Sequence, residues 1–176
     1  MQKSEFDEAY DDDPRRRAAE ERRLGESILN ARIADLNPPA PVMVPRSVSI
    51  REAIQVMLNR GIGAVLVESE GKAVGIFTER DVLRRVVLSG IDHGRAVSEV
   101  MTPDPDVLSL ADDAAFALNR MIVGGYRHIP LRDASGNTAG MLSVRDVVGF
   151  IDSLLPERVR NLPPEPGLEA RSPDGG

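Results

Sequence analysis

Residues 75–86, with the sequence GIFTERDVLRRV, and residues 140–151, with the sequence GMLSVRDVVGFI, decide the fold because they are two copies of one pattern. Each begins with glycine and apolar residues, as a buried strand does, and continues with apolar residues at helical spacing. At the junction stand a hydroxyl and, three positions later, a carboxylate: Thr78 and Asp81 in the first copy, Ser143 and Asp146 in the second. The repetition predicts an internal repeat.

The repeat extends upstream at a nearly constant offset. Residues 33–44 and 97–108 share an apolar, acidic and proline pattern, 64 residues apart. One buried helical face is then predicted at Ile50, Ala53, Ile54, Met57 and Leu58, and a second at Ala114, Ala117, Leu118, Met121 and Ile122. Strands are predicted at 63–67 and 127–131, and the turns after them change the offset to 65. Each copy ends with a further apolar helical face, at Val82, Leu83 and Val86 and at Val147, Val148 and Ile151.

We therefore predict a mixed α/β (α+β) chain of two β-α-β-β-α repeats. One repeat of about sixty residues is too small to bury a sufficient core alone, so the copies should pack about a pseudo-twofold axis and form paired clefts. The expected divisions are 1–24, a charged N-terminal extension that is mobile or partly helical; 25–96, the first repeat with a lead-in helix and linker; 97–155, the second repeat; and 156–176, a disordered C-terminal tail. Asp13 and Pro14 suit a helix start.

Composition argues against several classes of protein. The chain has 41% apolar and 28% charged residues, as soluble globular proteins do. A net charge of -6 with few aromatic residues argues against a nucleic acid partner. There is no cysteine, which excludes disulfides and thiolate metal sites, and no stretch resembles a signal peptide or membrane span. We expect a cytoplasmic protein with no membrane partner.

The repeated hydroxyl and carboxylate have two interpretations. Thr-x-x-Asp and Ser-x-x-Asp at a helix start resemble capping boxes, as does Ser49–Glu52. However, Arg80 and Arg145 stand in the first helical turn, where the helix dipole disfavours a cation. A helix N-terminus with a hydroxyl and an arginine suits a phosphate, whereas a carboxylate suits ribose hydroxyls. Capping and nucleotide binding both remain open at this stage.

The tandem repeat resembles a pair of cystathionine-beta-synthase (CBS) domains, over about residues 33–155. The first copy carries the resemblance in VPRSVSIREAIQVMLNRGIGAVLV and GKAVGIFTERDVL, and the second carries it in LSLADDAAFALNRMIVGGYRHIPL and GNTAGMLSVRDVV. The resemblance implies a module that senses an adenosine-containing ligand. It places phosphate and ribose contacts on Thr78, Asp81, Ser143 and Asp146, and further phosphate contacts on Arg127 and His128. The first copy has Gly63 and Ala64 in place of these last two. By the same resemblance, adenine lies near Val44 and Val65 in one cleft and near Leu108 and Ile129 in the other.

The residues offer little support for catalysis. The histidines are His93, in a polar linker, and His128, and the chain has no Gly-x-Ser-x-Gly elbow, P-loop or dinucleotide glycine fingerprint. We therefore expect a stand-alone regulatory CBS pair, not an enzyme, with no cofactor or metal. It should bind AMP, ADP, ATP or S-adenosylmethionine, form a homodimer and regulate an unidentified protein in trans. The alternative is a structural dimerisation module without a ligand.

Overall fold

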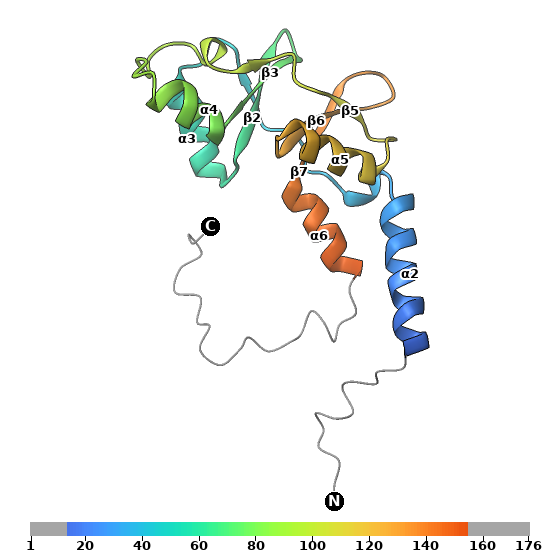
Figure 1. The fold of residues 1–176 in the computed structure, drawn as a ribbon. Coiled ribbons are helices and arrows are strands. Elements are labelled where there is room, and N and C mark those ends of the chain that lie inside the picture. Colours follow the sequence, from blue (N-terminus) through green and yellow to red (C-terminus); the bar gives the residue numbers. More distant parts are fainter. Residues whose placement is uncertain (1–13, 155–176) are drawn as a thin grey trace, which may run out of the picture.

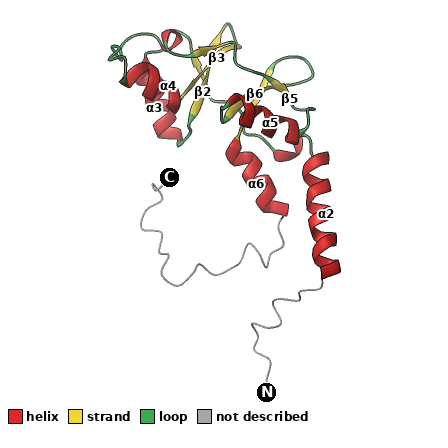
Figure 2. Cartoon of the chain, in the orientation of Figure 1, coloured by secondary structure: helices red, strands yellow, loops and turns green. Residues whose placement is uncertain are grey.

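The computed structural model describes residues 14–154, which form two repeats side by side (Figure 1). Both follow the predicted order of strand, helix, strand, strand and helix, which confirms the fold class. Figure 2 shows the chain as a mixture of helices and strands. The first repeat consists of β1 (Met43–Pro45), α3 (Ile50–Arg60), β2 (Ala64–Ser69), β3 (Lys72–Thr78), α4 (Glu79–Asp81) and the π-helix η2 (Val82–Val87). The second consists of β5 (Leu108–Ser109), α5 (Ala114–Gly124), β6 (His128–Arg132), β7 (Thr138–Ser143) and α6 (Val144–Leu154).

The two sheets share one topology. In the first sheet β2 pairs parallel with β1 and antiparallel with β3, and in the second β6 pairs in the same way with β5 and β7. The turn between β2 and β3 contains Glu70 and Gly71 at positive φ, 53° and 76°, the backbone conformation that two-residue hairpin loops favour. The sequence predicted this turn, because glycine adopts a positive φ without steric cost.

The segment that leads into each repeat packs on the sheet of the other repeat. β4 (Thr102–Pro103) lies just before β5 in the chain but pairs antiparallel with β3, where Gly75 faces Pro103. In the equivalent place, the backbone N–H of Met141 on β7 donates to the carbonyl oxygen of Pro39 at 3.3 Å. This reciprocal arrangement agrees with the predicted pseudo-twofold axis.

α3 begins with the capping box that the sequence predicted. The Ser49 hydroxyl accepts a hydrogen bond from the Glu52 N–H at 3.2 Å, and the Glu52 carboxylate accepts one from the Ser49 N–H at 3.0 Å. These bonds satisfy two of the free N–H groups at the helix start. The hydrogen bond from the Ser49 side chain also lowers the pKa of Glu52.

The helices cover the sheets less completely than their apolar periodicity predicted. The buried positions of α3 and α5 are Ile50, Ala53 and Met57, with their counterparts Ala114, Ala117 and Met121. Leu58 and Ile122, also expected to be buried, are 70% and 71% exposed. Leu83 and Val148, expected in the buried faces of the second helices, are 63% and 59% exposed. Periodicity identifies an apolar face, but the packing of the folded chain decides how much of that face is covered.

Opposite faces of the first sheet carry different apolar clusters. Val65, Val67 and Phe77 are fully buried in one cluster with residues of α3. Ala64, Leu66 and Ile76, each next to one of these, form another cluster with Met141 of the second repeat. Successive residues of a strand point to opposite faces. The residues that meet the other repeat are therefore one position away from those that meet the helices.

The helix α2 (Pro14–Asn30) precedes the repeats and begins at the proline that the sequence indicated. It lies beside α5 and α6 (Figure 1), and it continues through the predicted division at residue 24 as a single helix. Two short 3-10 helices, η1 (Ile33–Leu36) and η3 (Val97–Glu99), lead into the two repeats. The C-terminal tail expected at 156–176 and most of the N-terminal extension lie outside the described residues. None of the helices within 14–154 combines the length and apolar character that a bilayer crossing needs.

Candidate functional site

Two cavities lie between the repeats. The first cleft has a volume of about 470 Å³ and contains Thr78, Arg80 and Asp81 of the first repeat together with Arg127 and His128 of the second. The second cleft has a volume of about 330 Å³ and contains Ser143, Arg145 and Asp146 of the second repeat together with Gly61, Ile62 and Ala64 of the first. Both volumes fall in the range of small-molecule sites. Each cleft thus combines the hydroxyl and carboxylate motif of one repeat with the residues at the start of the second strand, β2 or β6, of the other repeat.

The two clefts share a wall formed by Gly63, Glu79, Arg127 and His128. A Cβ atom on Gly63 would lie 3.4 Å from the His128 imidazole and 3.1 Å from the Glu79 carboxylate, so a larger residue would crowd both groups. Arg127 and His128 thus border both clefts, although both belong to the second repeat.

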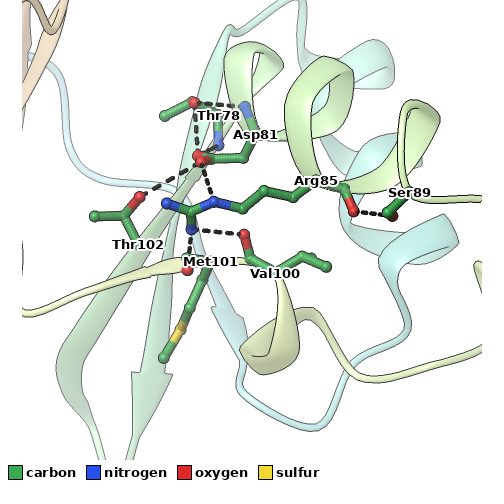
Figure 3. Close-up of polar contacts among 7 residues, drawn as sticks. All are labelled: Thr78, Asp81, Arg85, Ser89, Val100, Met101 and Thr102. Carbon is green, nitrogen blue, oxygen red and sulfur yellow. Dashed lines mark hydrogen bonds and ion pairs between the residues drawn. The ribbon is translucent and has the colours of Figure 1, made fainter. Parts of the chain in front are cut away.

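In the first cleft, Thr78 and Asp81 form a capping box at the start of α4 (Figure 3). Oδ2 of Asp81 accepts hydrogen bonds from the Thr78 N–H at 3.0 Å and from its hydroxyl at 2.7 Å, and the Thr78 hydroxyl accepts one from the Asp81 N–H at 3.3 Å. Asp81 is 7% exposed, and it is the only buried charged residue in the described part of the chain.

The other carboxylate oxygen of Asp81 also has partners. Oδ1 lies 3.5 Å from Nε of Arg85, and it accepts a hydrogen bond from the Thr102 hydroxyl at 3.4 Å. The Arg85 guanidinium also donates to the carbonyl oxygens of Val100, at 3.0 Å, and Met101 (Figure 3). Arg85 thus connects the first-repeat carboxylate to the segment that leads into the second repeat. The sequence did not identify this role, because Thr102 and the two carbonyls come from distant positions.

In the second cleft, Ser143 and Asp146 form the equivalent box at the start of α6. Oδ2 of Asp146 accepts hydrogen bonds from the Ser143 N–H and hydroxyl, both at 2.6 Å, and the Asp146 N–H donates to the Ser143 hydroxyl at 3.3 Å. Among residues 14–154, nothing hydrogen-bonds to Oδ1 of Asp146. The position equivalent to Arg85 holds Phe150, and the place of Thr102 opposite Ile76 is taken by Pro39, whose carbonyl oxygen accepts from Met141. The capping geometry predicted from sequence is present in both repeats.

The first cleft also contains side chains that the sequence did not single out. Tyr126 lies at its edge, and its hydroxyl donates to Asp106, which also pairs with Arg120. Burial is the largest cause that raises the pKa of Tyr126, and the hydroxyl of Tyr126 is the largest cause that lowers the pKa of Asp106. Arg80 donates to the carbonyl oxygen of Gly125, across the boundary between repeats. The sequence feature that could have indicated these side chains is the proline-rich segment 102–106, which contains Asp106 and leads into the second repeat.

His128 has a lowered pKa. Burial is the largest cause, and the neighbouring Arg127 acts in the same direction, while Glu79 and Asp146 oppose it. The lowered pKa favours the neutral imidazole at neutral pH. A phosphate group placed against His128 would favour the protonated form instead.

The four apolar residues expected beside adenine lie in the buried clusters of the two repeats, and their contact with adenine stays a prediction. Val44, Val65, Leu108 and Ile129 are buried in clusters with helix residues, and none of them lines either cleft. The cause is strand alternation, since neighbouring strand residues point to opposite faces of a sheet. The apolar residues that line the clefts include Ile76 and Pro105 in the first and Ile62, Ala64, Met141 and Val144 in the second.

Comparisons with known proteins place this arrangement in a family. A family model described as the CBS domain matches residues 33–88 and 97–153. The meiotically up-regulated gene 70 protein of Schizosaccharomyces pombe is 39% identical over 59% of this chain and 14% of its own length. An uncharacterised 17.7 kDa protein of Acidianus ambivalens is 32% identical over 60% of this chain and 63% of its own length. This chain thus covers less than two thirds of both curated relatives.

A solved structure extends the likeness to three dimensions. A CBS-domain-containing protein of Agrobacterium tumefaciens is 32% identical, with a TM-score of 0.63, and the match covers 68% of this chain and 98% of that one. The likeness includes both repeats, because a match of this length cannot fit within one of them.

Proposed function

The chain belongs to the CBS-domain family, and we propose that it is a regulatory module that binds an adenosine-containing ligand between its repeats. The observation that supports this most directly is the second cleft. There a carboxylate with an open oxygen, Asp146, lies with Arg145 and Arg127 in one cavity of about 330 Å³. A carboxylate suits ribose hydroxyls and arginines suit phosphate, so the set matches the polar parts of a nucleotide.

Structures with this fold indicate which compounds to test. A CBS-domain protein of Pyrobaculum aerophilum was solved with AMP, and a CBS pair, MJ0100, with 5′-methylthioadenosine and S-adenosylmethionine. At 24% and 19% identity these likenesses concern the fold alone. We therefore propose AMP, ADP, ATP or S-adenosylmethionine as the ligand class on the chemistry of the cleft residues. In the second cleft, Ser143 and His128 are the further polar contacts that we propose. Thr78 and Arg80 are the corresponding polar groups of the first cleft.

We propose signalling to another protein rather than catalysis as the output. The polar groups of the described clefts form capping boxes and ion pairs, which can hold a diol or an anion but do not activate a nucleophile. A bound ligand would bridge the two repeats and so change how they are held together. A regulated protein in trans is the proposed recipient of that change.

We also propose a homodimer, in which a second copy covers the open helix faces. Leu58 and Leu83 of the first repeat and Ile122 and Val148 of the second are exposed apolar residues at equivalent positions. A surface related to itself by an approximate twofold axis is suited to a symmetric interface. Covering such side chains stabilises association by about 25 cal/mol per Å² of apolar area.

The alternative is a structural dimerisation module without a ligand. It is favoured by one observation, that both carboxylates already serve as helix caps. A thermal-shift series separates the two functions, with adenosine, AMP, ADP, ATP and S-adenosylmethionine as probes and cytidine and CMP as controls. A ligand at about 100 times its Kd adds about 2.7 kcal/mol of stability, equivalent to a rise in Tm of roughly 5 to 10 °C. If no adenosyl compound raises the Tm above its cytidine control, the ligand-binding function is wrong.

A further inference from the structure

The carboxylates of the two clefts differ in their remaining hydrogen-bonding capacity, and we propose that only the second cleft binds the ribose while Arg85 closes the first cleft to it. This inference rests on the proposed function, because it assumes an adenosyl ligand. It makes Arg85 a specificity-determining residue of the first cleft. Neither the capping motif nor the family predicts this difference, because Thr78–Asp81 and Ser143–Asp146 are chemically alike.

The Asp81 carboxylate has no acceptor position left for a ligand. An ionised carboxylate offers about four lone-pair positions. Two are occupied at Oδ2 by the N–H and hydroxyl of Thr78, at 3.0 and 2.7 Å. The other two face the Thr102 hydroxyl, at 3.4 Å, and the Arg85 guanidinium, at 3.5 Å. A ribose hydroxyl would have to displace one of these donors from a residue that is only 7% exposed.

Arg85 is held in place by more than this ion pair. Its guanidinium donates to the carbonyl oxygens of Val100, at 3.0 Å, and Met101. These carbonyls lie immediately before β4, which is itself hydrogen-bonded to β3. Moving Arg85 away from Asp81 would leave a buried carboxylate without its cation, which is costly. The cleft therefore favours the closed arrangement.

The Asp146 carboxylate lacks both of these partners. Its Oδ2 is occupied by Ser143, as in the first cleft, but Oδ1 has no hydrogen-bond donor among the described residues. The reason is in the sequence, since the equivalents of Arg85 and Thr102 are Phe150 and Pro39. Two acceptor positions on one oxygen remain for the 2′- and 3′-hydroxyls of a ribose. Arg145 and the shared basic wall lie in the same cavity.

The test measures how each carboxylate contributes to recognition of one ribose hydroxyl. Titration calorimetry compares AMP with 2′-deoxy-AMP in the wild type, in Asp146→Asn and in Asp81→Asn. We expect one AMP per wild-type chain and a preference for AMP of about tenfold or more, as for a hydrogen bond to a charged group. Asp146→Asn should abolish that preference, whereas Asp81→Asn should retain it. Loss of the preference in Asp81→Asn, or two equivalent ribose-dependent sites in the wild type, would overturn the assignment.

A second pair of variants tests Arg85 itself. Arg85→Met removes the cation without adding an acceptor, so a second equivalent of AMP should bind with its own preference over 2′-deoxy-AMP. Arg84→Met is the matched control, because Arg84 also lines the first cleft but forms no hydrogen bond or ion pair within residues 14–154, and it should leave the stoichiometry at one. An unchanged stoichiometry in folded Arg85→Met refutes the closing role. If the wild type binds no AMP, the ribose assignment falls, whereas the proposed function falls only if every other adenosyl compound also fails.

Discussion

Replacing Gly75 with alanine should loosen the contact between the repeats. Gly75 lies on β3 opposite Pro103 of β4, and an added Cβ would overlap the Met101 side chain and lie 3.0 Å from the carbonyl oxygen of Thr102. The methionine side chain can move, but the Thr102 carbonyl belongs to the paired backbone. The substitution therefore forces β4 away from β3, and with it the segment whose carbonyls hold Arg85.

The expected magnitude follows from two opposing effects. Overpacking at a tight contact costs about 1 to 3 kcal/mol, whereas alanine in place of glycine regains about 0.5 to 1 kcal/mol of backbone entropy. The difference between these ranges is a net loss of about 0 to 2.5 kcal/mol, or up to roughly 10 °C in Tm for a chain of this size. Thermal and urea unfolding followed by circular dichroism measure it.

Two other glycines calibrate the result. At Gly140, the counterpart of Gly75, a Cβ would lie 3.3 Å from the carbonyl oxygen of Pro39, so Gly140→Ala should cost less than Gly75→Ala. At Gly149, inside α6, a Cβ would meet nothing within 4 Å, so Gly149→Ala should stabilise the chain by about 0.5 to 1 kcal/mol. A Gly75→Ala variant as stable as Gly149→Ala would refute the argument that the two strands are in close contact.

Three further predictions concern the clefts and the surface. Arg127→Ala should weaken ATP more than adenosine in calorimetry, with a smaller difference at high salt; equal losses for both would show that Arg127 does not recognise phosphate. Because burial lowers the pKa of His128, its stabilising contribution is present above about pH 6.5 and is lost as the pH falls through the lower folded-state pKa. As the pH is lowered from 7.5 to 5.5, the free energy of unfolding measured with urea should therefore fall less in His128→Gln than in the wild type. An equal fall in His128→Gln and in the exposed control His93→Gln would contradict this. Light scattering at micromolar concentration should give twice the 19.1 kDa chain mass for the wild type and for Val107→Asp, but the single-chain mass for Leu58→Asp; a wild-type monomer would exclude the dimer.

The sequence by itself determined the local structure of the repeats. The hairpin turn at Glu70–Gly71, the Ser49 capping box and the boxes at Thr78 and Ser143 all form where their residue patterns predicted. Each depends on contacts within a few residues of the chain, so the pattern contains all the groups that make the structure. The order of strands and helices could be predicted for the same reason, because hydrophobic period and turn residues are local properties.

Tertiary structure alone decided which residues meet in the clefts. Docking the repeats brought Arg127 and His128 next to the first-repeat motif and put Thr102 beside Asp81. It also exposed Leu58, and it buried Val65 in a cluster with residues of α3. These contacts join residues far apart in the chain, and they depend on which face of each sheet packs against the other repeat. Two copies with the same local pattern could therefore acquire different chemistry, since Arg85 pairs with Asp81 while Phe150 leaves one oxygen of Asp146 open.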